Sequence, residues 1–337
     1  MTQQEFLQDL EAFLQEWHND EPTVWVHTSG STGTPKPMQV EKERMMASAR
    51  LTCSFLGLKE GDSALLCMPL QYIAGKMVGV RSLGAGLKLV PIAPCGHPLK
   101  DLKEAPTFAA MIPMQVYNTL QEPEEREKLM GIKHLIIGGG AIDDALGKAL
   151  KDFPNHVWST YGMTETLSHI ALRRINGAQP ETNFSPLEGV TLTQDAEGCL
   201  IVFDPQTNDA PLHTNDLVEL LSDGRFRILG RRDNVVCSGG IKLQIEEIEH
   251  KLATVIPVPF MLTYVKDERL GQALTMLYTG DAFPSELHQL CVARVGRYEV
   301  PKHFFRVSSL PMTETGKPAR SEAHRVAEEL LKLSDNK

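Results

Sequence analysis

Short apolar segments alternate with helical segments through the first half of the chain, and this alternation restricts the fold more than any other feature. Apolar runs of strand length occupy residues 63–68, 88–92, 107–112 and 134–137, and stretches with helical character, beginning with 41–56, flank them. Such an order is typical of a largely parallel sheet with helices on its faces. We therefore predict an α/β fold whose large amino-terminal domain has a mostly parallel sheet.

The pattern changes from about residue 190. Apolar segments 200–203, 217–221 and 225–229 follow one another closely, and the last two are joined by a Ser-Asp-Gly turn. These segments predict antiparallel β hairpins. A chain of 337 residues with 42% hydrophobic residues is long enough to form two domains.

Charge and cysteine usage narrow the classes of function. The net charge of -9 argues against a general nucleic-acid partner or an anionic membrane. No apolar run approaches the roughly 18 residues of a membrane span, and no signal sequence is recognisable. The six cysteines are scattered without metal-ligand spacing, which fits a reduced cytoplasm.

The first residues predict an amphipathic helix. Apolar side chains recur at helical spacing between Phe6 and Trp17, so the helix is expected to dock by one face.

Residues 27–36 read His-Thr-Ser-Gly-Ser-Thr-Gly-Thr-Pro-Lys and follow the short strand 23–26. Small hydroxyl residues and glycines let backbone and hydroxyl donors converge on one anion, and a lysine closes the loop. We therefore predict a phosphate-binding loop at the carboxyl end of a sheet strand. The spacing fits neither the common nucleotide P-loop nor the dinucleotide turn, and a flexible connection is the alternative. The candidate residues are Thr28, Ser29, Gly30, Ser31, Thr32, Gly33 and Lys36.

Five further strings carry candidate chemistry. Each alone has a plain structural alternative: a tight turn for the glycines, a solvated carboxylate for the glutamate and a surface side chain for the last lysine. They are Ile-Gly-Gly-Gly-Ala at 137–141, Ser-Thr-Tyr-Gly-Met-Thr-Glu at 159–165, His-Thr-Asn-Asp-Leu at 213–217 and Gly-Arg-Arg-Asp-Asn-Val-Val-Cys-Ser-Gly-Gly at 230–240. A fifth, Leu-Pro-Met-Thr-Glu-Thr-Gly-Lys-Pro-Ala-Arg, occupies 310–320.

Together with the phosphate loop, these strings resemble, in the same order, the motifs of the adenylate-forming enzymes: acyl- and aryl-CoA synthetases, luciferases and peptide-synthetase adenylation domains. The resemblance implies ATP and Mg²⁺ as cofactors and coenzyme A as co-substrate. It also implies that Thr164 contacts the α-phosphate and that Glu165 holds Mg²⁺, for which a hard oxygen ligand is suitable. The nucleotide-binding residues implied are Gly138, Gly139, Gly140, Thr160, Tyr161, Asp216 and Arg231.

The same resemblance divides the chain into a large domain, 1–232, and a small mobile α+β domain, 233–337. Asp233 is the implied hinge, and Lys317 is the implied catalytic lysine, which would stabilise charge between the substrate carboxylate and the α-phosphate. Asn215 stands where the family usually has glycine, and asparagine also tolerates positive φ. The residues implied on the coenzyme A side are Ser238, Gly239 and Gly240.

Within the family, residues 161–171 and 238–240 are most similar to o-succinylbenzoate-CoA ligases of menaquinone biosynthesis. Arg81 matches an arginine of that subfamily, and a guanidinium is a natural partner for the second carboxylate of such a substrate. Ser168 is a second candidate contact. Tyr72 replaces a histidine common in that subfamily, and a plain core tyrosine is its alternative. Another aryl- or acyl-CoA ligase, or a non-catalytic adenylate-binding relative, is the alternative function.

One departure concerns the amino terminus. Family members usually carry a much longer segment before the phosphate loop than the 26 residues found here. We expect the helix around 6–17 to cover the sheet face left bare, with a homodimer through that face as the alternative.

Overall fold

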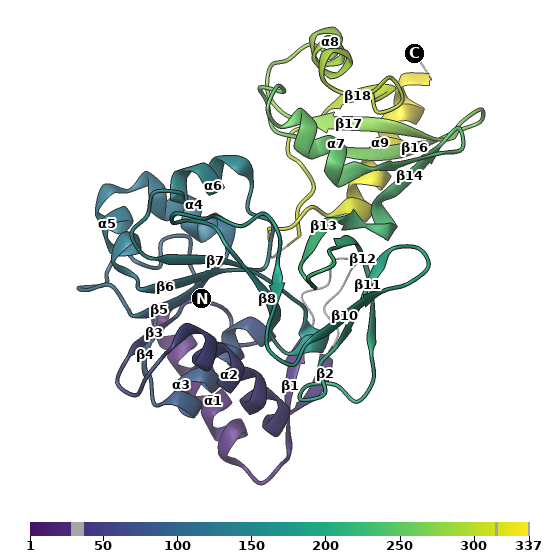
Figure 1. Cartoon of the computed structure of the whole chain (residues 1–337). Helices are drawn as coiled ribbons and strands as arrows, with labels where there is room; N and C mark the ends of the chain where they lie inside the picture. The colour runs from purple at the N-terminus through teal and green to yellow at the C-terminus, as the bar shows by residue number, and fades with distance from the viewer. Residues whose placement is uncertain (28–36, 314–315, 336–337) are drawn as a thin grey trace.

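The computed structural model describes residues 1–27, 37–313 and 316–335. Its largest sheet has seven strands in the order β4-β3-β5-β6-β7-β8-β9 (Figure 1). The pairings from β4 to β7 are parallel, whereas β8 and β9 join antiparallel. The strands are β3 (Ser63–Leu66), β4 (Lys88–Pro91), β5 (Phe108–Met111), β6 (His134–Ile137), β7 (His156–Gly162), β8 (His169–Arg174) and β9 (Ser185–Pro186). The predicted α/β fold with a mostly parallel sheet is confirmed.

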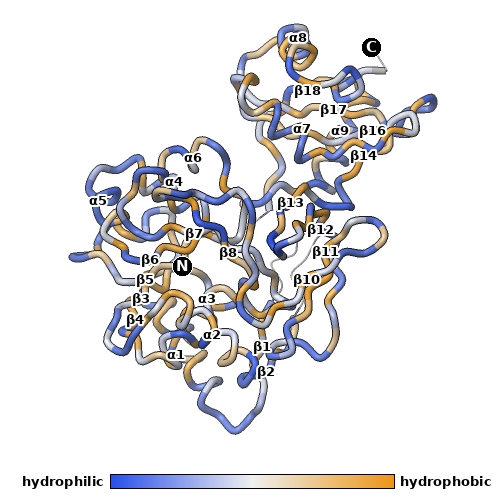
Figure 2. The backbone as a smooth tube through the Cα atoms, in the orientation of Figure 1, coloured by the Kyte–Doolittle hydropathy of each residue, from blue (hydrophilic) through white to orange (hydrophobic). Residues whose placement is uncertain are grey.

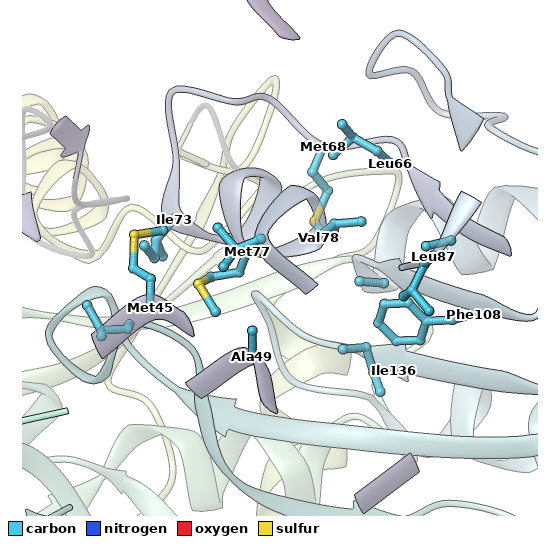
Figure 3. Packing of buried hydrophobic residues seen from close by; sticks show 14 of the residues in the cluster. Met45, Ala49, Leu66, Met68, Ile73, Met77, Val78, Leu87, Phe108 and Ile136 are labelled. Carbon is cyan, nitrogen blue, oxygen red and sulfur yellow. The ribbon is translucent and has the colours of Figure 1, made fainter. Parts of the chain in front are cut away.

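Helices cover both faces of this sheet because successive strand residues point to opposite sides. Leu66 and Phe108 belong to an apolar cluster with α2 (Lys42–Leu56) and α3 (Ile73–Ala85), part of which is seen in Figure 3. Leu65 and Ala109 belong to a second cluster on the other face. That face is covered by α4 (Pro113–Gln121), α5 (Pro123–Gly131) and α6 (Asp144–Leu150). Figure 2 shows the central strands as hydrophobic and α5 as largely hydrophilic.

The predicted amino-terminal helix is present as α1 (Gln3–His18). Thr2 caps its start, where its hydroxyl accepts from the amide of Glu5 and the Glu5 carboxylate accepts from the amide of Thr2. Phe13 packs over Gly79 of α3, where an added Cβ would lie 2.9 Å from the ring. Beside this contact, Lys76 of α3 forms a 2.7 Å ion pair with Glu16. The helix therefore buries its apolar face in the cluster on this side of the sheet, against α3.

The strand β1 (Thr23–His27) corrects one prediction, because it does not belong to the parallel sheet. It forms an antiparallel pair with β2 (Pro37–Glu41), and only an isolated parallel bridge joins His27 to Tyr72. β2 has no clear sequence signal, since its proline and polar residues are not typical of a buried strand.

A second sheet has four antiparallel strands, β10 (Thr191–Gln194), β11 (Cys199–Phe203), β12 (Leu212–Leu220) and β13 (Phe226–Arg231). The predicted hairpins are thus confirmed.

The remaining elements form a third sheet with its own helices. They are β14 (Val235–Ser238), β15 (Ile241–Gln244), α7 (Ile245–Leu252), β16 (Phe260–Asp267), β17 (Gly271–Tyr278), α8 (Pro284–Arg294), β18 (His303–Arg306) and α9 (Arg320–Asp335). The buried clusters here contain only residues from Val236 onward, and those of the other sheets end at Phe226. This separation favours the boundary expected between 232 and 233, which stays a prediction. Over the described residues no helix is long and apolar enough to cross a membrane.

Candidate active site

Three side chains from different strands meet at the end of β7. The hydroxyl of Tyr161 donates to Oδ2 of Asp216 over 2.6 Å. Asp216 of β12 is paired with Arg231 of β13, and the guanidinium Nη1 donates to Oδ1 of Asp216 over 3.1 Å. The hairpin register therefore fixes the ion pair, and each carboxylate oxygen has a donor.

The surroundings of Tyr161 keep its hydroxyl protonated. The side chain is 8% exposed, and its ring packs against Phe184 and Phe226 at centroid distances of 6.1 and 5.2 Å. Burial and then the negative charge of Asp216 raise the pKa of Tyr161 far above its usual value. The residue is thus a permanent hydrogen-bond donor to Asp216.

Lys317 reaches the same place from the carboxyl-terminal part of the chain. Two hydrogen bonds join Thr313 and Lys317: the Thr313 amide donates to the Lys317 carbonyl over 2.8 Å, and the Lys317 amide donates to the Thr313 hydroxyl over 3.0 Å. Burial and the nearby positive charge of Arg231 lower the pKa of Lys317, while Asp216 opposes them. The ammonium group is thus half-buried and close to both members of the ion pair.

The segment after β13 is tied to this cluster. Nη2 of Arg231 donates to Oδ2 of Asp233 over 2.9 Å, and the side-chain amide of Asn215 donates to the same oxygen over 3.1 Å. Burial lowers the pKa of Arg231, but its bond to Asp233 and the charge of Asp216 raise it by more. The expected hinge residue is thus held by both strands of the β12–β13 hairpin.

Bare backbone follows β6 at the expected glycines. A Cβ at Gly138 would lie 2.4 Å from the hydroxyl of Thr160, so no side chain fits there. Gly139 has φ of +78°, a conformation that glycine adopts without strain. The Thr160 hydroxyl donates to the Ile137 carbonyl over 3.4 Å. Gly138 therefore lies against Thr160, whereas Gly139 and Gly140 lie beside Ile112 and Pro113.

A short turn places Thr164 and Glu165. Both belong to the helical turn η1 (Thr164–Thr166), in which Thr164 is buried and Glu165 is exposed. The turn begins after Gly162, where a Cβ would lie 2.3 Å from the backbone carbonyl oxygen of Ser168. The side-chain amide of Asn208 donates to the Glu165 carbonyl over 3.0 Å, which fixes the backbone at the acidic residue.

Glu165 fits the implied Mg²⁺ by the chemistry of its donor. Carboxylate oxygen is the ligand type that Mg²⁺ prefers, and the ion is usually held by one or two carboxylates together with substrate phosphates. Among the described residues, no group of three or more His, Cys, Asp or Glu side chains could hold a metal ion. Glu165 would therefore hold the ion together with the phosphates of a nucleotide, rather than as part of a cluster of protein ligands.

Arg81 lies in a second, largely buried polar cluster. Its side chain is 2% exposed, and Nη2 donates to the hydroxyl of Ser168. Among the described residues, Nε of Arg81 has no hydrogen-bond partner and its guanidinium forms no ion pair. Burial lowers the pKa of Arg81 to about 10. A buried cation without a carboxylate is costly, so this site favours an anionic ligand.

Two groups of predicted residues are not brought to these clusters. Tyr72 is half-buried and precedes α3, nine residues from Arg81, or about 13 Å along a helix. Ser238, Gly239 and Gly240 form the turn of the β14–β15 hairpin, at the opposite end from the Val235–Gln244 pair. Lys317, rather than this turn, lies beside Arg231. The predicted phosphate loop falls on residues 28–36, outside the described residues.

Sequence reasoning assigned no role to three residues that support these clusters. They are Asn208, which holds the backbone of Glu165, and Thr52 and His169, which lie beside Ser168. Of these three, His169 could have been found from the sequence, because it is adjacent to the candidate contact Ser168.

Comparisons with known proteins identify the family of this chain. The family model described as AMP-binding enzyme matches residues 2–207. A 2-succinylbenzoate-CoA ligase from Bacillus mycoides (strain KBAB4) is 28% identical over 355 residues, which cover 95% of this chain and 73% of the relative.

Solved structures share the fold. An acyl-CoA synthetase (AMP-forming)/AMP-acid ligase II-like protein from Dyadobacter fermentans DSM 18053 is 32% identical, with a TM-score of 0.64 and coverage of 94% of this chain and 93% of that protein. The o-succinylbenzoate coenzyme A synthetase from Bacillus subtilis, solved with ATP and magnesium, has a TM-score of 0.75 at 23% identity, covering 89% of this chain and 69% of that protein. Since the family model matches more than half of its residues, the chain belongs to the AMP-binding enzyme family.

Proposed function

We propose that this protein is an AMP-forming ligase that activates o-succinylbenzoate with ATP and transfers the acyl group to coenzyme A. The observation that carries the proposal is the convergence of Tyr161, Asp216, Arg231 and Lys317, which come from separate parts of the chain. The named relatives act on 2-succinylbenzoate and on coenzyme A, as their names state.

In the first half-reaction, one oxygen of the acid attacks the α-phosphorus of ATP, and the bond to pyrophosphate breaks. Asp216 accepts hydrogen bonds from the ribose hydroxyls in this proposal, since Tyr161 and Arg231 hold its carboxylate in place. Lys317 stabilises the negative charge that shifts between the carboxylate and the phosphate, since its ammonium group is within electrostatic range of Asp216 and Arg231. Thr164 orients the phosphate, and the three glycines accept the adenine ring.

Glu165 holds Mg²⁺ in this proposal. The ion, when bound, offsets the negative charge of the phosphates. The side-chain amide of Asn208 keeps the backbone of Glu165 in position for that role.

In the second half-reaction, the coenzyme A sulfur attacks the acyl carbon, the thiol proton is released and AMP departs. We infer that the 233–337 domain turns about Asp233 to bring Ser238, Gly239 and Gly240 to the site in place of Lys317. Such a turn must break the bonds from Arg231 and Asn215 to Asp233.

The acid specificity rests on Arg81. The substrate has two carboxylates, and the one that does not react can pair with the buried guanidinium, whose Nε is unsatisfied. A monocarboxylic acid would leave this cation unpaired. We therefore propose that Arg81 selects a dicarboxylate, with Tyr72 farther along the acyl pocket.

The test is pyrophosphate exchange with a panel of carboxylic acids, including o-succinylbenzoate, benzoate and acetate. We expect exchange with o-succinylbenzoate to exceed exchange with the monocarboxylates by at least about tenfold, the size of a charge-assisted hydrogen bond. Equal rates with all acids would favour a general acyl- or aryl-CoA ligase, and no exchange with any acid would favour a non-catalytic adenylate-binding protein. A cytoplasmic location and a homodimer are further predictions.

A further inference from the structure

A chain of side-chain hydrogen bonds runs from Arg81 into the interior. Arg81 Nη2 bonds to the Ser168 hydroxyl, which lies 3.3 Å from Nδ1 of His169. Nε2 of the same imidazole lies 3.1 Å from the hydroxyl of Thr52, which in turn lies 3.3 Å from the carbonyl oxygen of Ser48. The chain therefore links α3 to α2 through the start of β8.

The two ends of the chain set the direction of every hydrogen bond in it. A guanidinium can only donate and a carbonyl can only accept. Thr52 has one hydroxyl hydrogen, which the Ser48 carbonyl accepts, so the Thr52 oxygen accepts from Nε2–H of His169. Nδ1 is then free to accept from the Ser168 hydroxyl, whose oxygen accepts from Arg81. If Nδ1–H of His169 donated to Ser168 instead, the Ser168 hydroxyl hydrogen would have no acceptor within this series of hydrogen bonds.

His169 is fully enclosed and neutral in this arrangement. It is 8% exposed, and burial together with the charge of Arg81 holds its pKa well below the usual range. A neutral imidazole has one donor and one acceptor. When Nε2–H donates to Thr52, Nδ1 must therefore act as the acceptor for the Ser168 hydroxyl. α2 and α3 pack against each other, and Met45, Ala49 and Met77 belong to one buried cluster (Figure 3).

We infer that Thr52 and His169 are positioning residues for the carboxylate-binding guanidinium. They orient the Ser168 hydroxyl so that it holds Nη2 of Arg81 and leaves Nε directed at the ligand. This inference rests on the proposed function, because the ligand is taken to be the second carboxylate of the acid. It makes Ser168 a support for Arg81, in addition to any contact with the substrate.

The first test does not need the substrate. Nitrogen-15 NMR of the imidazole in the ligand-free protein, assigned by comparison with His169→Gln, should show Nε2 protonated and Nδ1 unprotonated. In Thr52→Val, which removes the acceptor, the Nδ1–H tautomer should become populated. A protonated Nδ1 in the unchanged protein would overturn the inference, whatever acid the enzyme uses.

The second test separates positioning from general stability. Thr52→Val should raise the KM for o-succinylbenzoate about tenfold, because the bond between Ser168 and the charged guanidinium of Arg81 is weakened. The KM for ATP should be unchanged. Thr52→Ser keeps the hydroxyl and should restore the KM to within about twofold of the unchanged protein. In a Ser168→Ala background, Thr52→Val should have little further effect, because the chain is already broken.

The outcomes of these tests distinguish the two proposals. If the unchanged protein does not activate o-succinylbenzoate but shows the Nε2–H tautomer and the Thr52→Val response, the proposed substrate is wrong and the hydrogen-bond chain stands. If it activates o-succinylbenzoate and the effects of Thr52→Val and Ser168→Ala on KM simply add, the positioning role is wrong and the proposed function stands.

Discussion

The hydroxyl of Tyr161 is 2.6 Å from Oδ2 of Asp216, so the aromatic residue expected to flank adenine also fixes the aspartate expected to bind ribose. The two residues are 55 positions apart. Their bond joins the large parallel sheet to the β10–β13 sheet at the nucleotide site.

Tyr161→Phe should therefore impair ATP binding while leaving the ring in place. Asp216 keeps its bond to Arg231 but loses one of its two donors. A hydrogen bond to a charged group contributes about 1.5 to 3 kcal/mol, so the KM for ATP should rise about tenfold or more. Steady-state kinetics with varied ATP checks this, and Tyr264→Phe, in the carboxyl-terminal sheet, is a matched control. An unchanged KM for ATP would mean that the bond has no role in nucleotide binding.

Arg81→Ala should discriminate between acids. Loss of a charge-assisted contact from a buried site should lower kcat/KM for o-succinylbenzoate about 10- to 100-fold and have little effect on a monocarboxylate analogue. The measurement is kcat/KM for both acids at saturating ATP, with Arg173→Ala, which removes a half-buried arginine outside this cluster, as a control. Equal losses with both acids would show that Arg81 is structural.

The adenylation rate should fall at alkaline pH. Burial and Arg231 lower the pKa of Lys317 from the ordinary value of 10.5, so its positive charge is lost at a lower pH than that of an exposed lysine. The rate should be highest below this pKa and decline as pH rises through it. In Lys317→Arg the guanidinium keeps its charge, and the alkaline decline should disappear even if the rate is lower. The same decline in both proteins would assign it to another group.

Acid should destabilise the fold through His134. This side chain is 7% exposed and its ring nitrogens have no partner among the described residues, and burial lowers its pKa to about 4 from 6.5. Between these values the unfolded chain binds the proton and the folded chain does not, so stability should fall as pH decreases from 6.5 to 4. The free energy of unfolding should decrease by about 2 to 3 kcal/mol over this range. The contribution of His134 to stability is fully present above pH 6.5.

Urea unfolding at several pH values measures this effect. His134→Phe keeps an aromatic ring beside His156, which stacks at a centroid distance of 5.3 Å, but removes the titrating group. Its free energy of unfolding should depend less steeply on pH. Parallel pH dependence in the two proteins would rule out His134 as the source.

Much of the fold could be predicted from local patterns. The boundaries of β6 were predicted to the residue, because three apolar residues follow His134 and form a short run of strand length. The β1–β2 hairpin was missed because Pro37, Gln39 and Glu41 carry no apolar alternation, and its pairing is set by contacts that a local pattern does not contain.

The site was predictable where a motif is continuous in the sequence and not where contacts join distant segments. Arg81 and Ser168 were named together from the family resemblance, and the structure brings them into contact. Thr52 and His169 are 117 positions apart, and no spacing rule connects them. The position of Lys317 beside Arg231 likewise depends on how the carboxyl-terminal sheet packs near the β12–β13 hairpin.

Lys317 is expected to serve adenylation and then to give way to a second arrangement, and separate assays of the two half-reactions in Lys317→Ala measure this. Adenylation from ATP and o-succinylbenzoate should fall roughly 10²- to 10³-fold, by comparison with a lost oxyanion donor. Conversion of supplied acyl-adenylate and coenzyme A to the thioester should remain near the rate of the unchanged protein. If supplied adenylate is converted as poorly as ATP plus acid, the account of two successive arrangements is contradicted.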